Sequence, residues 1–492
     1  MLRNHAGIAV VLAAVCCLVV STGLAQDYLQ DDSPPSAYAL DGPVLTVQTI
    51  PLCPKNRALD GNWQSGLMGS DGNFYFGSST HSYYDSASFF RYRPGADDVE
   101  MLSQDVSADC GEDANTQVPQ GKLHSQLVEM DGWVYGSTHL GNYIWDRAAA
   151  YTGSHVLGWN MATDQVRDLG VTYGQSYTAY SAIAADPNRN YIYSLVTNWS
   201  GGGTRMVRQK VPREIDAKVD HEDPNQWQSW LVSYAGSVAG FAGFLDGQGN
   251  MWFNINAGYG SASNAAMYRV DPEGSLTAYS DAVPRRRNPL DDVEDANNQI
   301  AGYRYWQWGA RVDDDRYVFT MFQDGGLWEF DASKARDGDL SDAFKQINWL
   351  GATGLGITLA GDTIYYVANM DPNNLGAKSL DMRLRSVSLE PNSPVIDWGR
   401  IEDQAGRTPY RIETMAADDA GHVYFTGDFR IEDPDEREDY RTLRTLLGEN
   451  EGALVSLNRG QFMGTVTVAE PLTVAIFLAG AGVACWRRGR RR

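Results

Sequence analysis

The most regular pattern along the chain is a short polar turn followed by a strand in which aromatic and β-branched residues alternate. Glycine, aspartate or asparagine occupies each turn, and these residues favour the tight turns of β-hairpins. The strand after the turn has the period-two alternation of a half-buried β-strand, and no long stretch has helical periodicity. Seven copies occur, about 50–65 residues apart: Asp71–Phe76, Asp131–Tyr135, Asn188–Tyr193, Gly249–Phe253, Asp315–Phe319, Gly361–Tyr366 and Ala420–Phe425.

A second phrase follows most copies and has the pattern of another strand that ends in a turn. Several short strands per unit at a long, fixed period are typical of propeller blades, which bury both faces only by stacking. The pattern therefore predicts an all-β fold, a seven-bladed β-propeller of four-stranded antiparallel blades. An irregular array of β-sandwiches is the alternative, and the period is too long for a β-helix. Examples of the second phrase are Phe90–Gly95, Leu157–Asn160, Tyr268–Pro272, Leu327–Asp331 and Arg385–Leu389.

One further alternating segment, Val44–Ile50, precedes the first copy. We expect it to complete the last blade beside Ala453–Leu457 and so to close the ring. Two polar and charged stretches, residues 209–230 and 284–300, interrupt the repeat. Because such stretches bury little apolar surface, they are expected to be long surface loops, solvated or lining a binding face.

The first 25 residues have the pattern of a secretory signal peptide. Arg3 is followed by an apolar run, Ala9–Val20, and then by the small residues at Gly23–Ala25 that precede a cleavage site. An uncleaved anchor is the alternative, although the run is short for a bilayer span. We therefore predict an exported protein whose propeller occupies residues 26–462.

The last 30 residues, 463–492, carry a second targeting pattern. Ala469-Glu470-Pro471 precedes the apolar run Leu472–Trp486, and five arginines follow it. Such a helix stops in the inner membrane with its arginines in the cytoplasm. The tail resembles the PEP-CTERM sorting signal, although Ala469 stands where the first proline of Pro-Glu-Pro is expected. This resemblance implies a transmembrane helix cut by an exosortase-type enzyme and a final location at the cell surface or outside the cell. A plain C-terminal anchor is the alternative.

Charge and cysteine content narrow the classes of partner. The formal net charge of −22 opposes encounters with nucleic acid or with anionic membrane, so the inner membrane is expected as a partner only through the unprocessed tail. A polyanionic substrate would need a locally basic face. Between the two targeting segments only Cys53 and Cys110 occur. In an oxidising compartment we expect them to form a disulfide, with two unpaired thiols as the alternative.

Histidine is the residue whose placement points most clearly to chemistry. The chain has no P-loop, nucleophile elbow, zinc-protease helix or calcium-loop motif, and no cofactor is predicted. Four of its seven histidines, however, lie in the first two repeats: His81, His124, His139 and His155. His81 and His139 follow equivalent strands and are expected on the same rim of the ring. Imidazole serves as acid, base or metal ligand near neutral pH, and whether these residues hold a metal is left open.

The run from Lys122-Leu123-His124-Ser125 to Trp133-Val134-Tyr135-Gly136-Ser137-Thr138-His139, followed by Gly153-Ser154-His155, resembles seven-bladed propeller polysaccharide lyases, notably ulvan lyases. This resemblance implies β-elimination on a uronate, with a histidine and a tyrosine as base and acid and an arginine that neutralises the carboxylate. His124 and His139 match the family's histidines. The remaining roles are assigned by blade to Tyr177, Tyr180, Arg205 and Arg208.

An aromatic cluster in the fifth repeat, Tyr303–Trp308, is a further candidate for contact with sugar. We select Trp306, with His81 and His155, as substrate-binding residues; filling of the space between blades is the alternative for Trp306. Two functions therefore stay open. The first is a surface or matrix propeller that binds a glycan or a protein, and the second is a carbohydrate-active lyase that uses His124 and His139.

Overall fold

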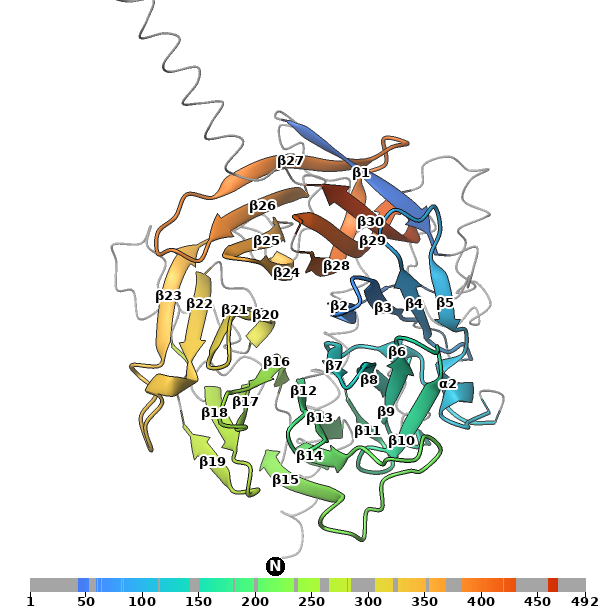
Figure 1. Ribbon diagram of the computed structural model, residues 1–492, viewed down its shortest axis with the longest axis vertical. Coiled ribbons are helices and arrows are strands. Elements are labelled where there is room, and N and C mark those ends of the chain that lie inside the picture. Colours follow the sequence, from blue (N-terminus) through green and yellow to red (C-terminus); the bar gives the residue numbers. More distant parts are fainter. Residues whose placement is uncertain are drawn as a thin grey trace, which may run out of the picture.

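The strands form a ring of twisted sheets around a central axis, so the β-propeller prediction is confirmed (Figure 1). This computed structural model describes residues 43–52, 59, 61–62, 64–80, 82, 84–113, 116–141, 150–179, 182–198, 202–233, 238–256, 265–280, 282–284, 306–321, 326–350, 354–368, 382–418, 420–430 and 459–467. Within these ranges the helical elements are α2 (Val106–Asp109) and the 3₁₀ turn η1 (Ala332–Lys334), and the other elements are strands.

Five blades are separate antiparallel sheets. The first contains β2 (Gly66–Met68), β3 (Phe74–Ser78), β4 (Ser88–Tyr92) and β5 (Glu100–Ser103). The second contains β6 (Lys122–Leu123), β7 (Val128–Met130), β8 (Trp133–His139), β9 (His155–Asn160) and β10 (Val166–Val171). The third contains β11 (Tyr177–Thr178), β12 (Ile183–Asp186), β13 (Tyr191–Asn198), β14 (Gly203–Lys210) and β15 (Trp227–Ser233). The fourth contains β16 (Val238–Leu245), β17 (Met251–Asn256), β18 (Ala265–Val270) and β19 (Leu276–Tyr279). The fifth contains β20 (Trp306–Arg311), β21 (Arg316–Met321), β22 (Gly326–Asp331) and β23 (Phe344–Trp349).

The remaining strands form one eight-stranded sheet, which corrects the prediction of seven separate blades. The cause is β1, which pairs in parallel with β27 on one side and antiparallel with β30 on the other. Closure of the ring by Val44–Ile50 was expected, but the observed antiparallel partner is β30, and Ala453–Leu457 lies outside the described residues. The strands of this sheet are β24 (Gly354–Ala360), β25 (Thr363–Ala368), β26 (Arg383–Ser388), β27 (Ile396–Asp403), β28 (Pro409–Ala417), β29 (His422–Arg430), β30 (Arg459–Thr467) and β1 (Val44–Pro51).

Because β30 reaches Thr467, the propeller extends past the predicted boundary at residue 462. The predicted signal peptide and the predicted transmembrane segment, Leu472–Trp486, lie outside the described residues. Among the helices of the described ranges, none has the length and apolar character that a bilayer span requires.

All seven turn-and-strand segments begin strands that pair antiparallel with the strand on the axial side of the same blade (Figure 1). These strands are β3, β8, β13, β17, β21, β25 and β29. In the second blade, Asp131 and Gly132 both have positive φ, 52° and 78°. Two such residues make the tight hairpin turn whose twist matches that of the flanking strands. The local sequence therefore determines where these strands begin.

An aspartate recurs in these turns and ties them to the next strand. Asp246 accepts hydrogen bonds from the backbone N–H of Asn250 (2.8 Å) and from the indole N–H of Trp252 (2.8 Å). Asp418 likewise accepts from the backbone N–H of His422 (2.9 Å) and from the Tyr424 hydroxyl (2.9 Å). One carboxylate thus fixes both the turn and a core aromatic residue.

Replacing Asp246 by alanine is expected to lower the free energy of unfolding by about 2–4 kcal/mol, because the buried donors on Trp252 and on the turn backbone lose their acceptor. Urea unfolding followed by tryptophan fluorescence measures this loss. Asp271 is the matched control, since it accepts from Ser275 N–H in a more exposed hairpin turn; Asp271→Ala is expected to cost less than about 1 kcal/mol. Equal losses in the two variants would contradict the role given to Asp246.

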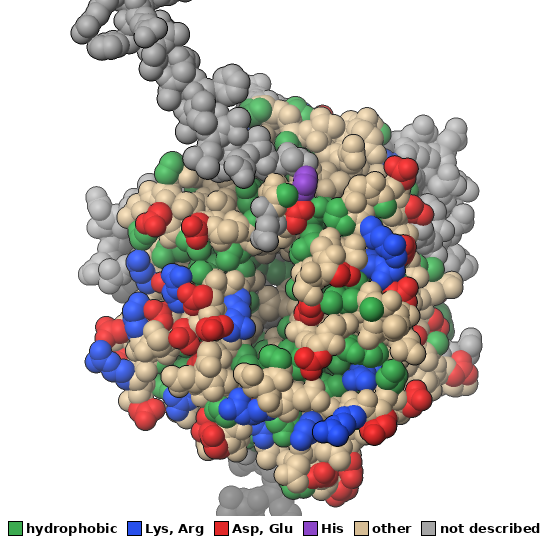
Figure 2. All heavy atoms as spheres, viewed as in Figure 1, with side chains coloured by type: hydrophobic (Ala, Val, Ile, Leu, Met, Phe, Trp, Pro, Cys, Tyr) green, Lys and Arg blue, Asp and Glu red, His purple; other side chains and the backbone are tan. Residues whose placement is uncertain are grey.

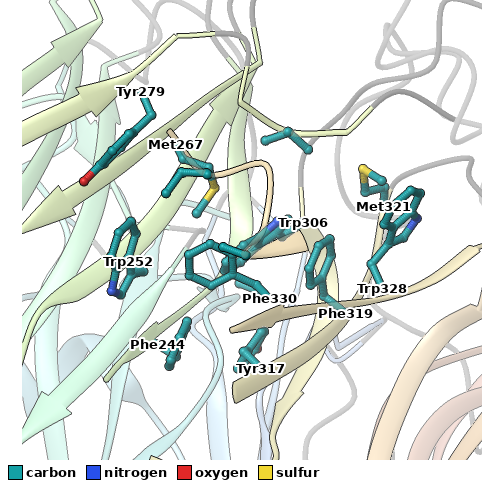
Figure 3. Close-up of a cluster of buried hydrophobic side chains, with 14 residues drawn as sticks. Phe244, Trp252, Met267, Tyr279, Trp306, Tyr317, Phe319, Met321, Trp328 and Phe330 are labelled. Atoms are coloured by element: carbon teal, nitrogen blue, oxygen red, sulfur yellow. The ribbon is translucent and has the colours of Figure 1, made fainter. Parts of the chain in front are cut away.

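Apolar clusters lie between neighbouring blades and hold the ring together. Figure 3 shows the cluster between the fourth and fifth blades, where Phe244 and Trp252 from one blade meet Trp306, Phe319 and Phe330 from the next. Equivalent clusters join the first and second blades, the second and third, the third and fourth, and the fifth blade to β24–β26. Because each blade has apolar side chains on both faces, it is buried only when neighbours cover both.

Candidate functional site

His124 and His139 lie side by side at one end of the second blade. The short strand β6 pairs with the C-terminal end of β8, so that Lys122 lies opposite His139 and Leu123 opposite Thr138. His124 follows directly, and its ring centroid is 5.6 Å from that of His139. The structure therefore brings together the two histidines that the sequence selected.

Tyr177 occupies the corresponding place in the third blade. There β11 pairs with the C-terminal end of β13, so that Tyr177 lies opposite Asn198 as Lys122 lies opposite His139. The Tyr177 hydroxyl donates to the Gly202 carbonyl at 2.7 Å. Its ring meets that of Tyr173 edge to face, with centroids 4.4 Å apart.

Arg205, on β14, lies close to this end of the third blade. It pairs with Val196 on β13, and its guanidinium carbon is 4.7 Å from the centroid of the Tyr173 ring. Such cation–π contacts are worth about 0.5–2 kcal/mol and hold an arginine in one orientation. Arg205 and Tyr173 are partly exposed, so this part of the site can meet a ligand.

Hydrogen bonds connect the two blades at this end. The backbone and hydroxyl of Ser154 donate to the Tyr177 carbonyl at 3.0 and 3.1 Å. The Tyr151 hydroxyl donates to Gln120, which also accepts from Thr138 next to His139. We call His124, His139, Tyr173, Tyr177 and Arg205 the rim site.

Burial divides the rim site into two parts. His139 is fully buried, and its Nδ1 faces the Leu140 carbonyl, while His124 is 9% exposed. The imidazole pair therefore lies below the surface, and Arg205 with Tyr173 forms the accessible part. His124 is the imidazole that a ligand can approach, with His139 behind it, and the guanidinium of Arg205 can neutralise a carboxylate, so this set of side chains suits an acidic sugar.

His155 belongs to a different cluster, so the structure separates it from the rim site. Its Nδ1 is 2.9 Å from Asp168 Oδ1, and its Nε2 is 3.3 Å from Glu112 Oε1. Cys110 follows α2 as its C-terminal cap and is a buried, free thiol. We call Cys110, Glu112, His155 and Asp168 the buried cluster. Because His155 is 4% exposed and bound to carboxylates, it is not a residue that reaches a glycan.

The electrostatics of the buried cluster follow from its low exposure. Burial alone lowers the pKa of His155, but hydrogen bonds to Asp168, Cys110 and Glu112 outweigh it and raise this pKa to about 12. Burial raises the pKa of each carboxyl group, yet the bonds from His155 bring the pKa values of Asp168 and Glu112 below their usual range. Burial also raises the pKa of the Cys110 thiol, to about 11. In this state the cluster is a neutral thiol beside a charged imidazolium.

The predicted disulfide between Cys53 and Cys110 is corrected by the same geometry. Cys110 has no bonded sulfur, because its side chain packs against His155 and Asp168 in the interior of the second blade. Cys53 lies outside the described residues. The sequence shows that two cysteines are present but not which side chains lie next to Cys110 in space, so it could not decide whether they form a disulfide.

Two further residues that were predicted to belong to the site are buried between blades. Arg208 is buried between the third and fourth blades, where it donates to the Pro272 carbonyl at 3.1 Å and to Gln228. Trp306 is fully buried between the fourth and fifth blades (Figure 3). Its ring stacks on Phe319 with centroids 4.6 Å apart, so it is not available to stack on a sugar. The alternative interpretation of Trp306, that it fills space between blades, is the correct one.

His81 and Tyr180 lie outside the described residues, and their roles stay predictions. Three contributors were not selected from the sequence, namely Tyr173, Glu112 and Asp168. Asp168 and Glu112 carry no local motif, since their partners come from other segments of the chain. Tyr173 lies four residues before Tyr177, and only the turn between them brings the two rings together.

One face of the ring is visible in Figure 2, with a hollow at its centre and acidic and basic side chains interspersed around it. No continuous patch of one charge covers this face among the described residues. A ligand of high charge therefore has no extended complementary surface there, and local groups such as those of the rim site must supply recognition.

Comparisons with known proteins find distant likenesses. No protein-family model matches the chain. No curated protein matches it. A puromycin-hydrolysing peptidase of Mycobacterium tuberculosis aligns with 78% of this chain at 9% identity and a TM-score of 0.44, and this chain spans about half (52%) of the peptidase.

Two shorter structures align with 63% of the chain. An ulvan lyase that represents a polysaccharide lyase family aligns at 14% identity with a TM-score of 0.37 over 79% of its length. The β-propeller domain of the Trilobed protease of Pyrococcus furiosus aligns at 11% identity with a TM-score of 0.34 over 80% of its length. At these levels of identity the likeness concerns the fold, and function has to be argued from the side chains. The arrangement of its strands makes the chain a β-propeller.

Proposed function

We propose that this chain is an exported propeller that binds a uronate-containing glycan at the rim site. The observation that carries the proposal is the position of the His124–His139 pair at one end of the second blade, with Tyr177 and Arg205 at the corresponding end of the third blade. These residues come from four strands or loops that are distant in sequence, and they offer a cation, aromatic faces and imidazoles. Recognition of an acidic sugar requires that combination.

The charges near the rim site support an acidic rather than a neutral glycan. The chain as a whole is strongly acidic, so a polyanion is repelled unless cations lie close to its carboxylates. Arg205 is held over Tyr173 and is partly exposed, which places a permanent cation where a ligand can reach it. The Tyr173 ring, which also stacks on Trp227, holds this cation in place through its face.

Binding of acidic glycans is tested by titrating the purified chain with polygalacturonate, alginate and ulvan, with neutral dextran as the control ligand. Arg205→Met is expected to weaken binding at least about tenfold, the loss of one charge-assisted contact. Lys210 is the matched control, since it is an exposed cation on the same strand, and Lys210→Met is expected to leave affinity unchanged. Equal binding of dextran and of the acidic glycans would contradict the proposal.

A second candidate function is β-elimination, favoured by the 5.6 Å separation of the two imidazoles. In this reaction a base removes the proton on the carbon next to the carboxylate, and electrons move to form a carbon–carbon double bond as the glycosidic C–O bond breaks. The leaving oxygen takes a proton from an acid. Arg205 would offset the charge that develops on the carboxylate, and the histidine pair with Tyr177 would supply the base and the acid.

Elimination is tested by the ultraviolet absorbance of the unsaturated uronate product. If the rim site catalyses it, His124→Ala and His139→Ala are each expected to lower kcat about 10²–10⁴-fold, the usual contribution of a general acid or base. His221→Ala is the control, since His221 packs on Trp227 outside the imidazole pair. If the chain binds the glycan but the absorbance does not rise, elimination is contradicted and binding is the function that remains.

Export and release stay part of the proposal. The signal peptide at residues 1–25 and the tail at 463–492 support a route through the inner membrane to the cell surface. Cell fractionation with antibody detection measures the location, and replacing Arg487, Arg488 and the three arginines at 490–492 by glutamine is the relevant change. We expect the altered chain to lose membrane retention, and a full-length chain in the cytoplasm of wild-type cells would contradict export.

We also infer that the eight-stranded sheet acts as two radial units, which would make seven in the ring. Its pairings divide into β24–β27 and β28–β30 with β1. In support, β24 contacts both β20 and β28, and β28 contacts β2, as the axial strands of successive blades do.

A further inference from the structure

We propose that Cys110, His155 and Asp168 bind a divalent transition-metal ion of the zinc class. The site is separate from the rim site, and the proposed function does not depend on it. The argument rests on the positions of the donor atoms, on their chemistry, and on the contacts that hold them in place.

The donor atoms are already gathered. One ligand atom from each of Cys110, His155 and Asp168 lies within 4.8 Å of the other two, and all three residues are buried. Around a tetrahedral zinc ion, with bonds of about 2.0–2.3 Å, neighbouring donors lie about 3.3–3.8 Å apart. Small side-chain adjustments are therefore enough to place the three donors around one ion.

The types of donor select the class of metal. A thiol sulfur, an imidazole nitrogen and carboxylate oxygens are the ligands of zinc and its neighbours in the first transition series. Calcium and magnesium prefer oxygen alone, and their usual sites contain neither cysteine nor histidine. The combination of Cys110 and His155 thus argues against a calcium or magnesium site.

The imidazole of His155 is held between two carboxylates. Nδ1 lies 2.9 Å from Asp168 Oδ1, and Nε2 lies 3.3 Å from Glu112 Oε1 on the other side of the ring. An ion bound by Nδ1 and Asp168 would therefore leave Glu112 beside Nε2. A carboxylate in that position orients a ligating imidazole and raises its basicity.

The surroundings hold the donors in place, as second-sphere contacts do in metal sites. Asp168 Oδ1 accepts from Gly170 N–H at 2.8 Å, and Asp168 Oδ2 accepts from Lys218. The pairing of β10 with β9 is irregular between Asp168 and Val171, a bulge that re-aims the side chains next to it. The Lys218 side chain is half exposed, so the cluster is connected to the surface of the protein through its ion pair with Asp168.

Formal charges are balanced both with and without the ion. Without it, the imidazolium of His155 and the ammonium of Lys218 offset the carboxylates of Asp168 and Glu112. With it, a divalent ion replaces one proton from His155 and one from Cys110, and the sum stays zero. Metal binding is therefore expected to release protons, as it does wherever thiols are ligands.

The ion would have a structural rather than a catalytic role, because its three ligands are buried. It would connect the end of α2 to β9 and β10. Glu112 also accepts from Gln120 Nε2 at 3.0 Å, and Gln120 accepts from Thr138 at 2.6 Å, next to His139. Through this chain of contacts the metal would stabilise the segment that leads to the rim site.

The test uses the purified full-length chain with Co²⁺ and Zn²⁺ as probes. We expect one equivalent of Co²⁺ per chain, with the near-ultraviolet charge-transfer absorption of a thiolate–cobalt bond. Cys110→Ser is expected to abolish this absorption and to weaken binding at least about 100-fold, and His155→Gln and Asp168→Asn to weaken it similarly. Cys53→Ser and His221→Gln are the matched controls and should retain the wild-type spectrum.

A second measurement does not depend on the folding of a variant. Chelator treatment of the wild-type chain is expected to lower its unfolding temperature, and one equivalent of Zn²⁺ to restore it, because an ion bound only to the folded state stabilises that state. The proposal is overturned if the wild-type chain takes up no stoichiometric Co²⁺ or Zn²⁺. It is equally overturned if the thiolate–cobalt absorption persists in Cys110→Ser and disappears in Cys53→Ser.

Discussion

Replacing Trp306 by alanine is expected to lower the free energy of unfolding by about 3–5 kcal/mol, the usual cost of truncating a buried tryptophan. Trp306 is fully buried, and its ring packs against Tyr317 and Phe319 on its own blade and lies 6.5 Å from Phe244 of the preceding blade. Truncation leaves a cavity at the junction of two blades, and neighbouring rings cannot collapse into it without breaking their own stacking. Denaturant unfolding measures the loss.

Trp306→Phe is the informative companion variant. Trp306 Nε1 is buried without a hydrogen-bond partner in the described part of the chain. Phenylalanine removes that unsatisfied group and keeps most of the apolar contact, so its cost is expected to be less than about 2 kcal/mol. A role in sugar binding predicts the opposite pattern, in which stability is unchanged in both variants and glycan affinity is lost. That outcome would contradict the core position of Trp306.

Replacing Val47 by aspartate is expected to destabilise the protein by about 4 kcal/mol or more, because a carboxylate would be buried in an apolar cluster without a partner. Val47 is fully buried on β1, where it packs in the cluster that contains Ile401 and Val466. It also lies opposite Asp403, so that the new charge would face a like charge. Because β1 is the strand that joins β27 to β30, the substitution is expected to weaken the strand pairing that closes the ring.

Gln48 provides the control one residue away. It is exposed on the opposite face of the same strand and pairs with Thr465. Gln48→Asp is expected to change the free energy of unfolding by less than about 0.5 kcal/mol. Urea unfolding and limited proteolysis of the two variants compare them directly. If Val47→Asp and Gln48→Asp behave alike, β1 does not hold the ring closed.

Some residues of the rim site could be placed from the local sequence pattern, and others could not. His139 ends the strand that begins at the Asp131-Gly132 turn, so its place on one rim follows from the turn and from the length of the strand. His124 could be placed beside it because it opens the same repeat. The contact of Arg205 with Tyr173, in contrast, depends on the loop that leads into β11, and no periodicity describes that loop.

The sequence by itself determined the strands and their order, because a polar turn and a period-two alternation are properties of neighbouring residues. It also indicated a propeller, since a repeat of short strands buries its faces only by stacking. Only the tertiary structure decided that β1 joins two sets of strands into one sheet, that Trp306 is a core residue, and that Cys110 faces His155 and Asp168. The physical reason is that pairing between distant strands, and the burial of a given side chain, depend on how blades meet in space. A side chain on a strand has its face fixed locally, but its partners come from the neighbouring blade.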